Sequence, residues 1–265
     1  MSRFPPLFLG MLAALTLSLG AEEPPISQIE AQPQRPTRSR NAQTTPAGTV
    51  QLETGVGVDR HDLTTDLTFR FGLTRKLDVS VEAVPYLRLD FDGNPRSGLG
   101  DTVLDTKFRF FDSREGSSAV EAFVKLPTAD KDKALGTGDT DAGFRFIASR
   151  NWRKDKFDFN LGGEFAGVPE VASNEAQWTL VLTWWRSVGD RLSFFGEGFL
   201  QFLPAADRED VTTDWGISYR FNPSFALDAA VYLGLTDDAP DYEVTVGITK
   251  ILGRTFTPRS TRGSR

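Results

Sequence analysis

The side chains that could carry chemistry in this chain are carboxylates and cations that recur at every second position of extended stretches. In "DLTTDLTFRFG", Asp66 and Arg70 share one parity, whereas Leu67 and Phe69 share the other. Successive side chains of a strand point to opposite faces, so one face of each stretch is charged and the other is apolar. Because an unpaired charge at low dielectric is costly, the charged faces must be ion-paired or in contact with water.

We predict that these charged faces line a polar conduit with both signs of charge on its wall. A closed interior of salt bridges is the alternative. An eight-stranded barrel is filled by its own side chains and sixteen or more strands leave an open channel, so an intermediate strand count allows either. The predicted pore-lining residues are Asp66, Arg70, Asp78, Glu82, Asp105, Lys107, Arg109, Glu121, Lys125, Arg145, Asp158, Glu164, Glu197, Asp214, Arg220 and Asp228.

Catalytic or metal chemistry has weaker support. The single histidine, His61, falls in a short loop between acids with no serine close by in sequence, so a solvated loop residue is favoured over a Ser–His lipid-cleaving site. Glu53 and Glu243 could share a proton, but a structural role is favoured. The "GTGDTD" run at 136–141 lacks calcium-loop spacing, and the chain has no cysteine. We therefore expect no catalytic residue, no metal and no cofactor.

Composition and the N-terminus indicate an exported protein that does not bind nucleic acid. The net charge is −6 and no long block of Lys and Arg is present. Arg3, an apolar run over 7–19 and small residues before Glu22 predict a signal peptide over residues 1–21. Residues 22–46, rich in Pro, Gln, Ser, Thr and Arg, predict a flexible periplasmic leader.

The charged and apolar faces require strands, because alternation at period two persists from Val50 to about Ile251. The pattern predicts an all-β domain over residues 47–253, followed by a basic tail over 254–265. About twelve strands are predicted, an even number that suits antiparallel closure. They span residues 48–58, 62–72, 77–89, 101–111, 118–127, 139–149, 156–167, 175–187, 191–203, 210–221, 225–235 and 242–252.

Loop lengths favour a transmembrane antiparallel up-and-down β-barrel over a soluble sandwich. Short turns at 74–76, 151–155, 189–190 and 223–224 alternate with longer loops at 90–100, 128–138, 168–174 and 205–210. Outer-membrane barrels have short periplasmic turns and longer external loops. The predicted strands are also about ten residues long, whereas strands of soluble sheets usually have five or six.

Four triplets place an arginine between two aromatic residues, "FRF" at 69–71, 108–110 and 144–146 and "YRF" at 219–221. If the N-terminus is periplasmic, each triplet falls at the periplasmic end of its strand, where an interfacial aromatic girdle belongs. The arginines then point into the lumen, and we expect each to pair with an acid of the next strand. The expected pairs are Arg70 with Asp78, Arg109 with Glu121, Arg145 with Asp158 and Arg220 with Asp228.

Four stretches carry a family resemblance: "GTVQLETGVG" at 48–57, "GLGD" at 98–101, "VKLPTADKD" at 124–132 and "LGLTDDAPDYEVTVGIT" at 233–249. In this order they resemble the outer-membrane transporters named for the meta-pathway of phenol degradation, over nearly the whole mature chain. The resemblance implies a bacterial outer-membrane β-barrel without implying a substrate or catalytic residues. Two departures are Ala129, where members tend to have glycine, and the terminal "GRTFTPRSTRGSR", where many barrels end on an aromatic residue.

These observations predict a passive outer-membrane channel for small solutes, with aromatic or hydrophobic compounds as one candidate class. The alternatives are a non-conducting structural barrel and a lipid-modifying outer-membrane enzyme. The expected location is the bacterial outer membrane, and the expected partners are outer-membrane lipid and a small solute. Neither the solute nor the oligomeric state follows from these patterns.

Overall fold

The computed structural model describes residues 25–91, 93–167 and 174–256. The expected signal peptide, most of the C-terminal tail and most of the predicted loop at 168–174 lie outside these residues. The strands are β1 (Thr49–Val58), β2 (Leu63–Gly72), β3 (Leu77–Ala83), β4 (Leu87–Phe91), β5 (Asn94–Gly98), β6 (Thr102–Asp112), β7 (Gly116–Leu126), β8 (Asp141–Trp152), β9 (Asp155–Gly167), β10 (Asn174–Val188), β11 (Leu192–Leu203), β12 (Arg208–Asn222), β13 (Phe225–Gly234) and β14 (Tyr242–Arg254). Short 3-10 helices cover Ile26–Gln28 (η1), Lys131–Lys133 (η2) and Pro204–Ala206 (η3). In the part of the chain described here, no helix is long and apolar enough to cross a membrane.

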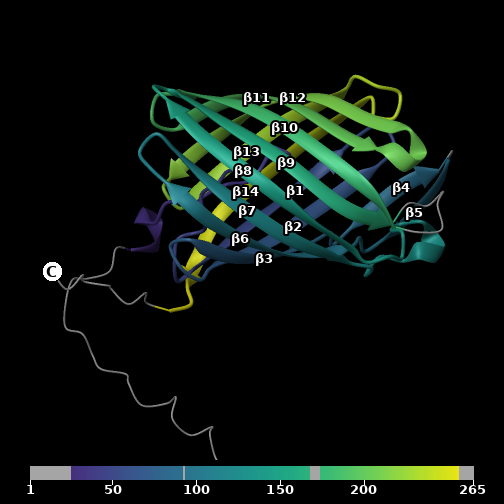
Figure 1. Cartoon of the computed structure of the whole chain (residues 1–265), viewed down its shortest axis with the longest axis horizontal. Helices are drawn as coiled ribbons and strands as arrows, with labels where there is room; N and C mark the ends of the chain where they lie inside the picture. The colour runs from purple at the N-terminus through teal and green to yellow at the C-terminus, as the bar shows by residue number, and fades with distance from the viewer. Residues whose placement is uncertain (1–24, 92, 168–173, 257–265) are drawn as a thin grey trace, which may run out of the picture.

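Twelve of the fourteen strands close into one antiparallel barrel (Figure 1). Strand β1 pairs with β2 on one side and with β14 on the other, so the first and last strands seal the wall. The remaining two, β4 and β5, form a hairpin at the end of the barrel that carries the long loops, and β4 pairs with the start of β2. The prediction of an up-and-down transmembrane barrel of about twelve strands is confirmed.

The third predicted strand is interrupted. Where the sequence predicts one strand over 77–89, β3 ends at Ala83 and β4 begins at Leu87. Pro85 lies in the break and has no N–H to donate to a ladder. Tyr86 compensates, because its carbonyl accepts a bond from the Thr65 N–H at 2.9 Å and its N–H donates to the Thr65 hydroxyl at 2.8 Å.

The wall has two chemically different faces. Apolar side chains such as Phe144, Leu182 and Val246 are 56%, 58% and 53% exposed on the outside. On the inner face, Arg70 and Lys107 are only 1% and 0% exposed. This apolar-out, charged-in alternation is the one expected of a barrel surrounded by lipid.

The aromatic triplets place rings on the outer face but not at one height. Triplets 108–110 and 219–221 lie close to the ends of β6 and β12, where each strand also carries a bulge. Triplet 144–146 instead lies in the first half of β8, so the prediction that every triplet ends its strand is wrong there. The register explains the difference, because Phe108 and Phe146 both face Val120 and so lie in one cross-strand row. The strands of a barrel tilt relative to its axis, so residues in one such row lie at different heights along their own strands.

The structure places the segment before β1 inside the barrel, not outside it. Of residues 31–48, Ala31, Gln34, Ser39, Ala42 and Thr45 are among those that are 5% exposed or less. The prediction of a flexible periplasmic leader over 22–46 is therefore wrong for this part of the segment. Its polar composition gives no apolar core of its own, but the charged barrel wall supplies partners for its polar groups.

Candidate functional site in the barrel lumen

Residues 31–47, called the plug segment below, enter and leave the lumen at the same end. The Ala31 N–H donates to the carbonyl of Pro223 at 2.9 Å, at the turn between β12 and β13. On the way out, the Gly48 N–H donates to the carbonyl of Gly72 at 2.7 Å, at the end of β2. Both contacts lie at the end that carries the short turns, on the left in Figure 1. The segment therefore fills the lumen as a loop from one side.

The two arms of the plug segment hold each other. The Asn41 N–H donates to Oε1 of Gln34 at 2.8 Å, and Nδ2 of Asn41 donates to the carbonyl of Pro33 at 2.7 Å. At the tip, the hydroxyl of Tyr232 on β13 donates to the carbonyl of Pro36. The loop is thus compact and touches the wall at its furthest point.

Wall carboxylates accept hydrogen bonds from the plug segment's main chain. Glu53 on β1 accepts from the N–H groups of Gln34 and Arg35 at 2.9 and 3.0 Å. Glu197 on β11 accepts from those of Arg38 and Ser39 at 2.7 and 3.1 Å. Buried amides need such partners when no strand ladder supplies them. The wall is therefore complementary to the backbone of the segment and not only to its charge.

Arg35 lies in a notch of the wall formed by two glycines. Its guanidinium contacts Asp66 on β2 at 2.5 Å and Asp228 on β13 at 3.3 Å, and it donates to the Thr245 hydroxyl at 2.8 Å. A Cβ added to Gly247 on β14 would lie 2.4 Å from Nε of Arg35. The guanidinium therefore lies directly against the backbone of the wall.

Arg38 lies in a different environment, made of rings and one carboxylate. Its guanidinium carbon is 4.5 Å from the ring centre of Phe199 and 4.9 Å from that of Tyr232. Its Nε lies 3.5 Å from Asp214 on β12. A cavity of about 150 Å³ adjoins it, lined also by Gln201. Aromatic faces and a carboxylate together form a favourable site for a cation.

Arg40 joins a buried ion cluster. Its Nη2 contacts Glu82 on β3 at 2.5 Å, and the same carboxylate contacts Arg70 at 2.7 Å. Arg70 also lies 3.2 Å from Glu53 and 3.8 Å from Asp105. The acids of this cluster thus balance one cation from the wall and one from the plug segment.

The predicted pore-lining residues divide into two groups according to their partners. The group that contacts residues 30–45 comprises Asp66, Asp78, Glu82, Lys107, Arg109, Glu197, Asp214, Arg220 and Asp228. The group with wall partners comprises Arg70, Asp105, Glu121, Lys125, Arg145, Asp158 and Glu164. Whether they line a conducting pore stays a prediction.

None of the four expected arginine–acid pairs is formed. Arg70 lies opposite Ser80 and donates a hydrogen bond to Glu82. Asp78 lies opposite Gly72 and accepts a hydrogen bond from the Thr45 N–H of the plug segment. Of the other three arginines, Arg109 contacts Asp112 and Arg145 contacts Glu121. Arg220 contacts Glu30. Two features cause the error. The register places Ala119, Gly162 and Ala226, not the acids, opposite Arg109, Arg145 and Arg220. The plug segment also takes up two of the acids, Asp78 and Asp228.

Sequence reasoning missed the plug segment's arginines and the glycines that receive them. The available signal is the run "RPTRSR" at 35–40, which is basic within an acidic chain. Gly55 and Gly247 give no comparable signal, because glycine inside a strand has several causes.

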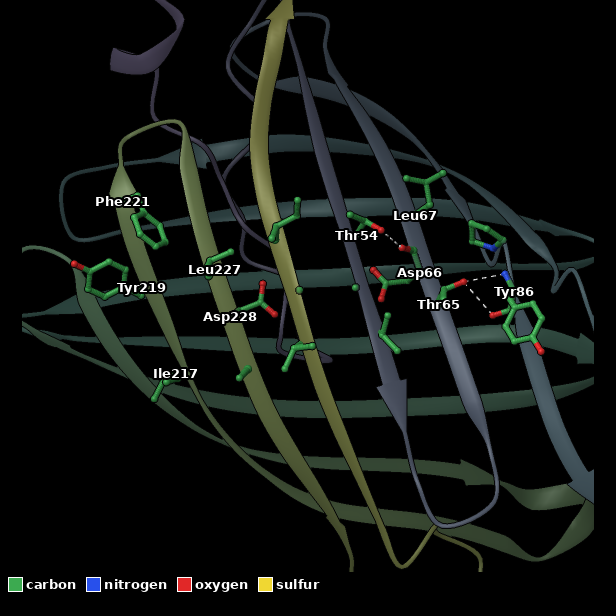
Figure 2. A pocket seen from close by; sticks show the side chains of 17 residues that line it. Thr54, Thr65, Asp66, Leu67, Tyr86, Ile217, Tyr219, Phe221, Leu227 and Asp228 are labelled. Atoms are coloured by element: carbon green, nitrogen blue, oxygen red, sulfur yellow. Dashed lines mark hydrogen bonds between the residues drawn. The ribbon is translucent and has the colours of Figure 1, made fainter.

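A groove of about 980 Å³ follows the outer wall where the lumenal notch lies on the inner side (Figure 2). Its lining crosses β12, β13, β14, β1 and β2 and includes the exposed side chains of Ile217 and Val246. Tyr219 and Phe221 flank one side and Tyr86 the other (Figure 2). Because Gly55 and Gly247 have no side chains, only the backbone separates Arg35 from this groove.

Solved structures with a similar fold include porins. The KdgM porin gives a TM-score of 0.56 at 8% identity, covering 76% of this chain and 98% of KdgM. The NanC porin gives the same TM-score, identity and coverage. At this identity the likeness shows the fold alone. No curated protein is a significant sequence match for the chain.

The family is shown by a separate sequence comparison. Residues 34–249 match the model of the family described as "Putative MetA-pathway of phenol degradation". The match begins within the plug segment and ends within β14, so it includes at least part of every strand of the ring and most of the lumenal contacts described above. The chain belongs to this family.

Proposed function

We propose that the protein is an outer-membrane channel for small solutes, partly closed by its own plug segment. The observation that carries the proposal is the inner wall, where charges of both signs lie behind an apolar outer face. A lipid-facing barrel has no structural need for so many inward charges, whereas a water-filled path for polar solutes does. The porin fold and the family membership support the same function.

Transport, not catalysis, is the proposed activity. His61, the only histidine, is exposed in the turn between β1 and β2 and lines a cavity at the long-loop end together with several aspartates. Aromatic or hydrophobic compounds remain one candidate solute class, and the ring faces of Phe199 and Phe123 beside the 150 Å³ cavity would suit them.

A second candidate, a non-conducting barrel, is favoured by one observation: the plug segment buries Arg70 and Lys107 almost completely. Planar-bilayer conductance separates the two. The full chain should conduct weakly, and a variant with residues 32–45 replaced by a Gly-Ser linker of equal length should conduct more strongly. Correctly folded barrels of both proteins that carry no current would overturn the channel proposal.

The outer-membrane location has its own test. Membrane fractionation should recover the protein with the outer membrane, and its gel migration should change on boiling. Recovery in the soluble periplasm without detergent would contradict this location.

A further inference from the structure

The notch that holds Arg35 is built from one row of residues across four neighbouring strands. Asp228 on β13 faces Gly247 on β14, Gly247 faces Gly55 on β1, and Gly55 faces Asp66 on β2. Figure 2 shows Asp228 and Asp66 on either side of β14 and β1. The row therefore presents a carboxylate, two positions without side chains and a second carboxylate.

The shape of this row fits a flat cation. A Cβ on Gly247 would lie 2.4, 2.5 and 2.7 Å from Nε, Nη2 and Cζ of Arg35, so the guanidinium occupies the volume that a side chain would need. Opposite charges on both sides and the Thr245 hydroxyl supply acceptors for its N–H groups. A planar group with several donors uses such a site better than a spherical ion does.

The occupant belongs to the chain, but the site belongs to the wall. Asp66, Asp228, Thr245 and the glycines are all strand residues that the barrel holds in place without the plug segment. Arg35 reaches them from a loop that enters through one end of the lumen. The Asp66 side chain is 34% exposed, so solvent and small solutes can approach one side of the contact.

We propose that this notch is a cation-binding site of the channel for guanidinium or primary ammonium groups of solutes, and that such solutes open the channel by displacing Arg35. The inference rests on the proposed channel function, and it adds a solute class and a means of opening. Arg35 acts as a tethered ligand with an effective concentration on the order of millimolar. Free cations compete with it in that range or above.

The test compares two glycine variants of the same strand. Gly247→Ala places a methyl group in the notch, where the three nearest atoms all belong to Arg35, whereas a Cβ on Gly253 has nothing within 4 Å. We expect Gly247→Ala and Arg35→Ala each to raise open probability in planar bilayers about tenfold, the change that 1.4 kcal/mol produces. Gly253→Ala should match the unmodified chain. Gel migration before and after boiling verifies folding of each variant.

Ligand dependence gives the second readout. Millimolar guanidinium chloride should raise the open probability of the unmodified chain and of Gly253→Ala, but not of Gly247→Ala. Tetramethylammonium chloride at equal ionic strength should have no effect, because that cation has the same charge but no N–H donor.

The outcomes separate the two proposals. If even the variant lacking residues 32–45 carries no current, the channel function fails. If that variant conducts but guanidinium acts no better than tetramethylammonium, or Gly247→Ala behaves like Gly253→Ala, the notch is not a solute site and this inference is overturned.

Discussion

The two halves of the lumen share one wall pattern and differ in what fills them. Near the short turns, the plug segment covers the wall, and Asp78 and Lys107 are both 0% exposed. Near the long loops, a cavity of about 450 Å³ is lined by Asp59, Asp210 and Asp241 with a few other residues. Alternation in the strands fixes which side chains face inward, and the plug segment adds the contacts that bury those near the short turns.

This difference makes the two halves respond differently to the same kind of substitution. In the filled half, charges are held in partnerships that exclude solvent, so losing one partner leaves an uncompensated charge. In the open half, water can replace a lost partner. Three of the four predictions below compare a position from each half, and the other tests the strand pairing; they follow in order of decreasing expected effect.

The largest effect is expected at Arg70. Arg70→Ala leaves Glu53, Glu82 and Asp105 with one cation fewer, which should lower the free energy of unfolding by about 3–5 kcal/mol. Arg88→Ala at the long-loop end removes an exposed contact to Asp90 and should cost under about 1 kcal/mol. Urea unfolding in lipid vesicles measures both. Equal losses would show that the two halves do not differ in burial of charge.

A smaller effect is expected at Glu197, a wall carboxylate that accepts hydrogen bonds from the plug segment's backbone. Glu197→Gln keeps the shape but replaces one of the two acceptor oxygens with an NH2 donor, so either the Arg38 or the Ser39 N–H loses its acceptor. The unsatisfied contact costs about 1–3 kcal/mol, which should loosen the segment and raise conductance. Glu164→Gln, in the open half, alters a contact with Gln177 and should leave conductance near its starting value. The reverse ranking would contradict the assigned position of the plug segment.

A double-mutant cycle tests which strand supplies each partner. Arg145 contacts Glu121 at 2.5 Å across β7 and β8, so Arg145→Ala and Glu121→Ala should couple by about 0.5–3 kcal/mol in unfolding. Arg109→Ala should not couple to Glu121→Ala, because Arg109 contacts Asp112 and Gln43. Coupling in the second cycle and none in the first would restore the hairpin pairing expected from sequence.

The smallest effect is expected at the exposed rims. Asp241→Asn removes one negative charge from the open cavity and should lower the preference for cations by a small factor that disappears at high salt. Asp190→Asn, in the short turn between β10 and β11, should change selectivity less, because it lies outside the cavity. Reversal potentials across a salt gradient measure both. A larger change in the reversal potential for Asp190→Asn than for Asp241→Asn would place the ion-selective region at the short-turn end of the barrel.

The sequence predicted the barrel well because alternation reports local geometry. The predicted range 225–235 matches β13 to within one residue, and the ring closes with the expected number of strands. The break at Pro85 could also have been predicted from the sequence, because proline has no N–H to donate to the hydrogen-bond ladder of a sheet. The register within the hairpins could not, because it depends on where each turn falls and on bulges such as those in β6 and β12.

The site was harder to predict than the fold because its partners come from a segment without periodicity. The composition of residues 22–46 is that of a disordered chain, and in isolation it cannot offset the entropy of ordering. Glu53, Glu197 and Asp78 supply the missing partners, and they are distant in sequence from the residues they bind. Only the close spacing of Arg35, Arg38 and Arg40 indicated that this segment binds a surface rich in carboxylates.

The route of the plug segment gives the channel a mechanical sidedness. Both arms pass through one rim, so the segment can be withdrawn through that rim without the separation of any strands. Only residues 46–48 join Thr45 to β1, and this linker spans about 10 Å when extended. A withdrawn segment therefore stays beside the opening, and its return is a first-order event whose rate does not depend on how many copies the membrane holds.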